Sequence, residues 1–548
     1  FSEDDGTAIL YGKSHADLPT EDQAGPKTQT ADPAAKPEMM AVDWLDRCTL
    51  FFEGDNPDNL IINRADLVGA VAVKTKQIQL NSDALNLHFA PPETAPAAPT
   101  TQPARASPAL RQLDAFGNVK SLLTGPNGPD DLRKLDCDNL KLRTSKAPDG
   151  RLYARNVDAI GHVHTKDPRS ELSAGYLHAV LGVPSTQPTT KPTTRPGRKA
   201  EMDTGELESL VAHDDVHAIM DDGSTADAVR LDIAVKDGKK AITLQGNPAV
   251  VTRKDGKLIG EIIHIVPETE QLSVTGAGRM DGVQRSAPDQ PPRPVTVTWE
   301  KSLLGHENVI ECLGGVVLNT IGSDGSKDVA VGRQVILTTT RPTTLPTTQP
   351  TAGAKMAKKG PATQPIASAK KPTTKPGDFD VMGDREIQSV ILDGSAAVTS
   401  TITDAQGALL QQRHIDAERM EFYHDNPKAK RLVIPVPGRM LTVDNRPPAT
   451  QPTDAAAADD PMSMRGALAF QWNKSLNYDE SKQQVVMLGG VQIVRQDQGT
   501  DQKMTLTGDT LTADVEPPPQ PATKPAAAPP TAATPVVPAK MNIKKVHV

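Results

Sequence analysis

Between its proline-rich stretches, the chain places apolar residues at every second position, and this alternation limits the fold more than any other feature. The segments Gly69–Leu80 and Ala84–Phe89 show it clearly. A period of two is that of a half-buried strand, because successive side chains point to opposite faces of a sheet. No long segment with the period of an amphipathic helix competes with it. The sequence therefore predicts an all-β fold.

Turn chemistry separates the alternating runs. Pairs that favour tight turns bound them, namely Asp149-Gly150, Asp237-Gly238, Asp255-Gly256 and Gly489-Gly490. The shorter runs lie at 135–142, 229–235, 242–251, 258–266, 331–337 and 485–494. We therefore expect an antiparallel meander that is built hairpin by hairpin.

Most of the 48 prolines fall in five windows, at 91–108, 184–197, 340–376, 446–461 and 517–540, which share Thr-Gln-Pro triplets. Such segments cannot bury enough apolar surface to offset the entropy lost on ordering. They are expected to be disordered spacers whose lysines and arginines are solvated. Mucin-like glycosylation and a PxxP ligand are the less favoured interpretations.

The predicted organisation alternates modules with linkers. A flexible N-terminal segment (1–37) is followed by part of a β module (38–90), a linker (91–108) and a β module (109–183). A linker at 184–200 precedes a module at 201–339, and a linker at 340–380 precedes a β repeat at 381–445. A linker at 446–461, a β repeat at 462–516 and a linker at 517–540 follow, and a further strand begins in 541–548. Because the chain starts at Phe1 without an apolar leader, we expect a fragment or a processed chain.

An internal repeat underlies this organisation. Residues 261–280 align without a gap on residues 421–440, and both copies end in Gly-Arg-Met. The segments after them, which begin at Trp299 and Trp472, also match, and Trp44 fits the same element loosely. Tryptophans at equivalent positions of repeats are predicted to be core anchors rather than a ligand-facing ring. Arg279 and Arg439 are interpreted as exposed arginines after a turn glycine, in preference to an anion site.

A glycine followed closely by valine recurs along the chain, at Gly69, Gly117, Gly161, Gly246, Gly315 and Gly490. Alternating strands such as Leu135–Leu142 follow at some distance. This cadence resembles the OstA-like family of lipopolysaccharide-transport proteins, which includes LptA, LptC and organic-solvent-tolerance proteins. The segments that carry the resemblance are Leu113–Lys120, Arg151–His164 and Ile242–Arg253 with Leu258–Gly260.

The resemblance implies tandem β-jellyrolls, each a V-shaped pair of antiparallel sheets around an apolar groove. In that family the groove holds the acyl chains of lipopolysaccharide in the periplasm, and modules join by edge-strand pairing. It therefore implies a non-catalytic lipopolysaccharide-binding and transport component of the cell envelope. The candidate groove residues are Val71, Val73, Ile78, Leu80, Leu85, Leu87, Leu244, Val250, Leu258 and Ile262. At each single position an ordinary sandwich core is the favoured interpretation, because alternation does not distinguish a closed core from a lipid-filled groove.

The chain departs from the family in carrying several repeats with Thr/Pro-rich insertions, where family bridge proteins are compact single jellyrolls. A longer bridge is one interpretation. The main alternative is an extracytoplasmic β-repeat scaffold that binds protein partners by strand addition without lipid. A carbohydrate-active β-solenoid enzyme is less favoured, because no strand face shows clustered acidic residues.

The charge and the motifs of the sequence argue against several other classes of protein. A net charge of −8 argues against nucleic acid, and no apolar run reaches the roughly 20 residues of a spanning helix. The three cysteines form neither a disulfide framework nor a zinc spacing. His162 with His164, and His213 with His217, lack a third metal ligand. Without a nucleotide or hydrolase motif, no enzyme, cofactor or metal is predicted.

Overall fold

The computed structural model describes residues 6–19, 39–53, 61–75, 78–90, 109–124, 132–147, 152–183, 207–254, 256–284, 293–322, 325–340, 386–426, 429–446, 466–497, 502–516 and 542–547. Nearly all of them form antiparallel strands, and the helical element among them is a single 3-10 turn, η3 at Pro267–Thr269. The all-β prediction is confirmed. No helix of the described part is long and apolar enough to cross a membrane. The proline-rich windows lie almost wholly outside these residues.

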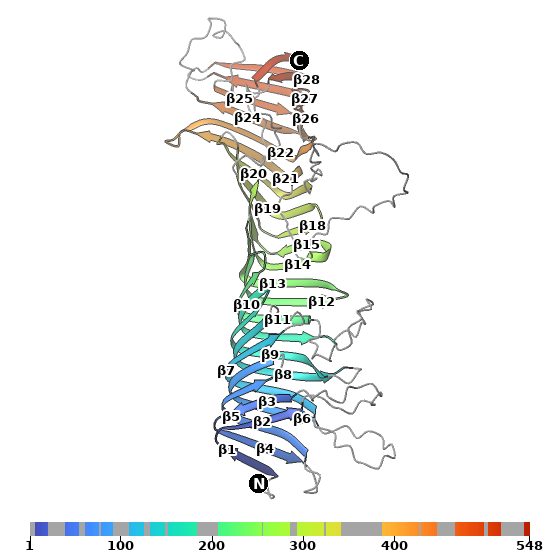
Figure 1. Cartoon of the computed structure of the whole chain (residues 1–548). Helices are drawn as coiled ribbons and strands as arrows, with labels where there is room; N and C mark the ends of the chain where they lie inside the picture. Colours follow the sequence, from blue (N-terminus) through green and yellow to red (C-terminus); the bar gives the residue numbers. More distant parts are fainter. Residues whose placement is uncertain are drawn as a thin grey trace, which may run out of the picture. The chain divides into compact units, whose positions relative to one another are not determined.

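The chain divides into two compact units, residues 1–254 and 255–548. In the first unit, each strand from β5 to β13 pairs with the next one in the chain, as Figure 1 shows in blue to green. Its strands are β1 (Thr7–Tyr11), β2 (Ser14–Pro19), β3 (Met39–Trp44), β4 (Arg47–Glu53), β5 (Ile61–Lys74), β6 (Ile78–Ala90), β7 (Ala109–Thr124), β8 (Leu132–Lys146), β9 (Leu152–Asp167), β10 (Ser170–Leu181), β11 (Leu207–Met220), β12 (Thr225–Lys236) and β13 (Lys239–Arg253). Residues 7–19, part of the segment expected to be flexible, thus form β1 and β2.

The second unit joins long strands to layers of two short strands. Its strands are β14 (Gly256–Val266), β15 (Gln271–Thr275), β16 (Gly278–Gln284), β17 (Arg293–Trp299), β18 (Ser302–His306), β19 (Val309–Ile321), β20 (Lys327–Thr340), β21 (Glu386–Thr403), β22 (Leu409–Asn426), β23 (Ala429–Ile434), β24 (Gly438–Asp444), β25 (Gly466–Trp472), β26 (Ser475–Asp479), β27 (Gln484–Gln496), β28 (Lys503–Glu516) and β29 (Asn542–His547). Strands β19 to β22 pair in chain order, whereas β14, β22 and β27 each border a layer of two short strands.

Seven of the described strands contain two consecutive residues with positive φ, and the pairing register shifts at that point. The pairs are Gly69-Ala70, Gly117-Asn118, Gly161-His162, Asp214-Asp215, Gly314-Gly315, Gly394-Ser395 and Gly489-Gly490. The residue after each pair is at most 2% exposed: Val71, Val119, Val163, Val216, Val316, Ala396 and Val491. We call this series of β-bulges the bulge line. The bulge line divides each long strand into two arms. It also explains why a glycine followed closely by a valine recurs in the sequence, since the glycine begins the bulge and the buried valine follows it.

Close approach explains why glycine opens most of these bulges. A Cβ at Gly117, whose φ is +71°, would overlap the carboxylate of Asp83 on the neighbouring strand. Only glycine combines an easy positive φ with the absence of a Cβ. Gly246 departs from the pattern, because it lacks a positive φ and is followed by the cis peptide Asn247-Pro248, with Ala249 as the buried residue.

Where the sequence repeats, two short strands meet at the bulge line in what we call a split layer, and the described residues contain three copies of the split layer that carries a tryptophan. The copies are β3 with β4 on β5, β17 with β18 on β19, and β25 with β26 on β27. In each copy an amide between the short strands donates to the first bulge glycine: Leu45 to Gly69 O (2.7 Å), Glu300 to Gly314 O (2.6 Å) and Asn473 to Gly489 O (2.7 Å). The three copies therefore share one backbone geometry.

In each of these three copies, a tryptophan is the last residue of the first short strand. Trp44, Trp299 and Trp472 are 3%, 2% and 0% exposed, so they lie in the core rather than facing a ligand. Their partners across the ladder are Ser14, Gly278 and Gly438. A Cβ at Gly438 would lie 2.6 Å from Cζ2 of Trp472, which explains the glycine of Gly-Arg-Met.

Replacing Gly438 with Ala is expected to lower the free energy of unfolding by about 2 kcal/mol, because the added methyl overpacks the Trp472 ring. Urea denaturation of the full chain measures this. The Trp472→Phe variant should tolerate Gly438→Ala better than the parent does, since the smaller ring relieves the overlap. Ser14→Ala is the matched control, because Ser14 already carries a Cβ opposite Trp44. Equal losses from Gly438→Ala in the parent and Trp472→Phe backgrounds would contradict the assignment.

Candidate functional site

A continuous apolar ladder crosses the first unit beside the bulge line. Each member is the register partner of the next, and none is more than 5% exposed. The members are Cys48, Leu67, Leu85, Ala115, Leu140, Ala159, Leu177, Ala212, Leu231 and Leu244. On the other side of the bulge line, Val71, Val119, Val163 and Val216 begin a second buried row with Ser82, Cys137 and Ala174. The two arms therefore share an apolar inner face.

Burial of this inner face decreases away from the bulge line. The next ladder outward begins with Ala65, Leu87 and Leu113, which are at most 8% exposed. It continues through half-buried Leu142 and Val157, then Ala179, which is 8% exposed, and then half-buried Leu210, Ile233 and Ile242. Apolar surface toward the strand ends is thus only partly covered by protein.

The second unit repeats the arrangement. Seven of its inner residues are each 0% exposed: Ile263, Val274, Leu303, Cys312, Val335, Leu392 and Met420. The other arm carries a ladder of Leu258, Met280, Val297, Leu318, Ala330, Val398, Ile415, Met440, Phe470, Ile493 and Leu506. Leu258 is half-buried and Leu506 on β28 is 39% exposed, so this ladder loses cover at its ends.

Most candidate groove residues lie on the inner face. Six are at most 5% exposed (Val71, Val73, Leu80, Leu85, Leu87 and Leu244), and Ile78 and Leu258 are half-buried. Val250 and Ile262 differ. Val250 pairs with Asp227 on the outward side, and Ile262 is 37% exposed, whereas their neighbours Ala249 and Ile263 are fully buried. The alternation changes phase within β13 and β14, so beyond that point a strict period of two selects a residue on the outer face.

The three cysteines belong to the inner face. Cys48, Cys137 and Cys312 are buried and form no disulfide. Burial raises the pKa of Cys48 and Cys137 to about 11 and that of Cys312 to about 12. A thiol that stays protonated at neutral pH is a poor nucleophile and metal ligand. These side chains therefore serve as apolar packing groups.

The outer face carries many charged side chains, and several of its histidines contact carboxylates. His162 contacts Asp138 (2.8 Å), His164 contacts Glu171 (2.9 Å), His217 contacts Asp227 (2.6 Å) and His213 contacts Asp214 (2.8 Å). Arg279 and Arg439 likewise pair with Asp281 and Asp416, which fits exposed arginines after a turn. The described residues hold no group of three or more ligands that could bind a metal.

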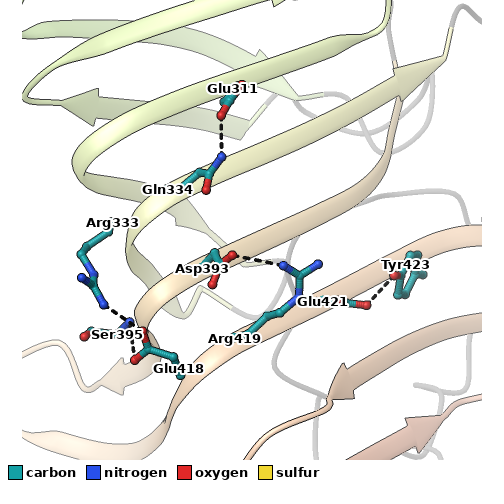
Figure 2. A network of polar contacts seen from close by, with 9 residues as sticks. All are labelled: Glu311, Arg333, Gln334, Asp393, Ser395, Glu418, Arg419, Glu421 and Tyr423. Atoms are coloured by element: carbon teal, nitrogen blue, oxygen red, sulfur yellow. Dashed lines mark hydrogen bonds and ion pairs between the residues drawn. The ribbon is translucent and has the colours of Figure 1, made fainter.

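One polar network was not foreseen from the sequence (Figure 2). It surrounds the bulge of β21, where the Ser395 amide donates to Glu418 Oε2 (3.2 Å) and Arg333 Nη2 donates to Glu418 Oε1 (2.8 Å). Beside it, Arg419 bridges Asp393 (3.1 Å) and Glu421 (2.6 Å). These residues come from β20, β21 and β22, so the network ties three strands together at the bulge line.

Glu421 has the most enclosed carboxylate of this network, at 16% exposed. Burial alone would raise its pKa, but hydrogen bonds from Tyr423 Oη (2.5 Å) and Arg419 Nε (2.6 Å) outweigh that effect. The pKa of Glu421 therefore lies below its usual value of 4.5. Such a group stabilises the fold while it is ionised.

Comparisons with known proteins add little. No family model matches the chain, and no curated protein matches it. Among solved structures, the chain aligns with TcdB2-TccC3 without its hypervariable C-terminal region, over 93% of this chain and 46% of that chain. The sequence identity is 7% and the TM-score is 0.07, a likeness that carries no argument about fold or function.

Replacing Glu421 with Gln should lower the free energy of unfolding at pH 7 by about 1 to 2 kcal/mol, because the Arg419 and Tyr423 donors lose their charged acceptor. The lowered pKa means that this contribution is present above pH 4.5 and is lost as the pH falls through the folded-state pKa. Urea denaturation at a series of pH values should therefore show the parent and variant converging in acid. Glu418→Gln, whose carboxylate is 58% exposed, is the control with a smaller effect. A difference that stays constant down to pH 2.5 would contradict the assignment.

Proposed function

We propose that the chain is a non-catalytic component of the cell envelope that binds lipopolysaccharide or a similar glycolipid. The two arms of each unit act as the V-shaped sheets of OstA-like jellyrolls, and acyl chains lie between them. One observation supports this most directly: in the first unit the inner face is almost wholly apolar, fully buried beside the bulge line and mostly half-buried toward the strand ends, whereas that of the second unit also carries buried polar side chains such as Asp328 and Asp444.

The dimensions of the inner face suit acyl chains. Paired strands lie about 4.8 Å apart, so nine strands from β5 to β13 present an apolar face of about 38 Å. Each methylene moved from water into such a face contributes about 0.8 kcal/mol. The charged outer face leaves a polar headgroup in solvent. A role in transport to the outer membrane, in the periplasm, follows from the OstA-like resemblance.

Strand addition is the proposed way in which the chain joins other jellyroll transport proteins. In the second unit, the split layers β15 with β16 and β23 with β24 are each bordered by a long strand, β14 or β22. The corresponding layer of the first unit, β1 with β2, pairs only with β4 and β3 among the described residues. Leu10 on β1 is consequently 45% exposed, whereas its equivalents Val274 and Ile434 are fully buried.

Among the described residues, one part of the long strand β28 also has a paired neighbour on one side only. In the described residues, Lys503–Gly508 of β28 pairs only with β27, and Met504 and Leu506 are 67% and 39% exposed. A sheet edge with exposed apolar residues is a template for pairing with another chain. A β28 edge placed against β2 of another copy would reproduce the pairing of β14 with β16.

The second candidate function is a β-repeat scaffold that binds protein partners without lipid. The observation that favours it is the complete burial of the seven inner residues from Ile263 to Met420 in the second unit. Such a closed core leaves no room for a ligand unless the arms separate. Lipid capture distinguishes the two functions.

A photo-crosslinking amino acid at position 258 should capture the acyl chains of lipopolysaccharide, because Leu258 is half-buried on the inner face. The matched control is position 262 on the same strand, where Ile262 faces outward. The full chain is mixed with lipopolysaccharide, irradiated and analysed by mass spectrometry. Capture at neither position would support the scaffold, and equal capture at both would indicate non-specific adsorption.

Replacing Leu506 with Lys should weaken self-association of the full chain at least about tenfold, since Leu506 lies on the part of β28 that is proposed to pair and a charge on an edge strand opposes strand addition. Sedimentation velocity over a concentration series measures this. Val229→Lys is the matched control, because Val229 is 57% exposed on β12, away from any free edge. A parent chain that stays monomeric at every concentration would contradict edge pairing between copies and leave the lipid proposal standing.

A further inference from the structure

The outer face of the first unit carries an exposed apolar stripe along the bulge line. The stripe consists of the residue before each bulge together with its register partners on the strands that carry no bulge. All of these residues lie on the face opposite the inner ladder. Its members are Val68, Ala84, Phe116, Asn139, Ile160, Tyr176 and His213, each the register partner of the next. Val68, Phe116 and Ile160 are 37%, 41% and 48% exposed. The Tyr176 and His213 rings stack at 4.6 Å and extend the stripe onto β11.

A row of aspartates runs beside the stripe, one residue away along the strands. The side chains of Asp46, Asp83 and Asp138 lie over Gly69, Gly117 and Gly161, and all three are exposed. Because the three glycines are on β5, β7 and β9, successive carboxylates are two strands apart, about 9.6 Å. The outer face thus presents apolar surface and regularly spaced negative charge together.

The second unit shows that the fold requires neither feature. There the side chains over the bulge glycines are Lys301 at Gly314, Arg333 at Gly394 and Lys474 at Gly489. The stripe positions on β20 to β22 are Gln334, Asp393 and Arg419, which form hydrogen bonds and ion pairs (Figure 2). Beside these glycines the same backbone geometry therefore carries the opposite charge, and on β20 to β22 it carries a polar surface, whereas Leu488 at the stripe position of β27 is apolar and 38% exposed. In the first unit, Asp83 accepts a hydrogen bond from Asn118 and Asp138 contacts His162, and both carboxylates remain exposed beside the apolar stripe.

We propose that this surface binds a proline-rich segment of a partner protein that carries a lysine or arginine at every third residue. A polyproline II helix has three residues per turn and rises about 3.1 Å per residue, so such cations recur every 9.3 Å on one side. That repeat matches the 9.6 Å spacing of the carboxylates. Proline rings pack against Phe116, Ile160 and Tyr176, as aromatic-lined surfaces hold proline-rich ligands elsewhere. A membrane surface fits less well, because the aspartate row repels anionic headgroups.

The test uses the full chain and a fluorescent twelve-residue peptide, (Lys-Pro-Pro)4, at low ionic strength. Fluorescence anisotropy should show saturable binding that weakens with added salt. Two control peptides separate charge from spacing: (Ser-Pro-Pro)4 lacks the cations, and (Lys-Pro-Pro-Pro)4 has four lysines at the wrong repeat. Both should bind at least about tenfold more weakly, because they lose the charge or the match of spacing.

Variants of the two units show whether the peptide binds at the stripe and aspartate row of the first unit. The triple variant Asp46→Asn, Asp83→Asn, Asp138→Asn keeps side-chain size and should weaken binding of (Lys-Pro-Pro)4 about tenfold or more, as should Phe116→Gln. Leu488→Gln, at the equivalent stripe position of the second unit and 38% exposed, should leave binding unchanged. Thermal unfolding confirms that each variant is folded. Equal affinity for the two lysine peptides, or an unchanged affinity in the triple variant, overturns the proposal. Loss of self-association in the triple variant also overturns the proposal. That result would mean that the aspartate row binds the row of Lys301, Arg333 and Lys474 on a second copy.

Discussion

The structure depends on one backbone constraint: two consecutive residues in the left-handed region, with a side chain from the neighbouring layer lying over the first of them at the six bulges that begin with glycine. At Gly117 both requirements meet, because φ is +71° and Asp83 occupies the space of a Cβ. The bulge shifts the register and divides the strand into two arms. Repetition on β5, β7, β9, β11, β19, β21 and β27 aligns these divisions into one line within each unit. The buried ladders, the split layers and the outer stripe are all defined by that line.

The inner face is mainly apolar in both units, whereas the outer face differs between them. The inner face keeps its apolar character in both, from Leu85 in one to Leu392 in the other, since both must bury the arms. The outer face changes charge, from Asp83 beside one bulge to Arg333 beside another. The shared inner face fits a common ligand chemistry such as acyl chains. The different outer faces fit separate protein contacts for the two units.

Local patterns predicted the elements well, because alternation and turn pairs depend only on neighbouring residues. The antiparallel strands, the internal repeat and the buried tryptophans follow from the sequence in this way, whereas the split layers, in which β14 pairs with β16 and β22 with β24, interrupt the expected hairpin-by-hairpin meander. The sequence placed only some of the candidate groove residues on the inner face. Val250 and Ile262 lie beyond points where the alternation changes phase, which a strict period cannot anticipate. The network around Glu418 joins it to Arg333, 85 residues away, and no local pattern indicates such a pair. The strands β1 and β2 are short, and their role as a split layer is visible only beside the internal copies.

The central claim is that acyl chains lie between the two arms of a unit. Crystals of the full chain with a glycolipid brominated on its acyl chains test it directly, through the anomalous scattering of bromine. The account predicts bromine peaks on the inner face, between the half-buried ladder of Leu142 and Val157 and the valines that follow the bulges. Peaks confined to the outer face, or an inner face that remains filled by its own side chains at saturating glycolipid, would contradict it.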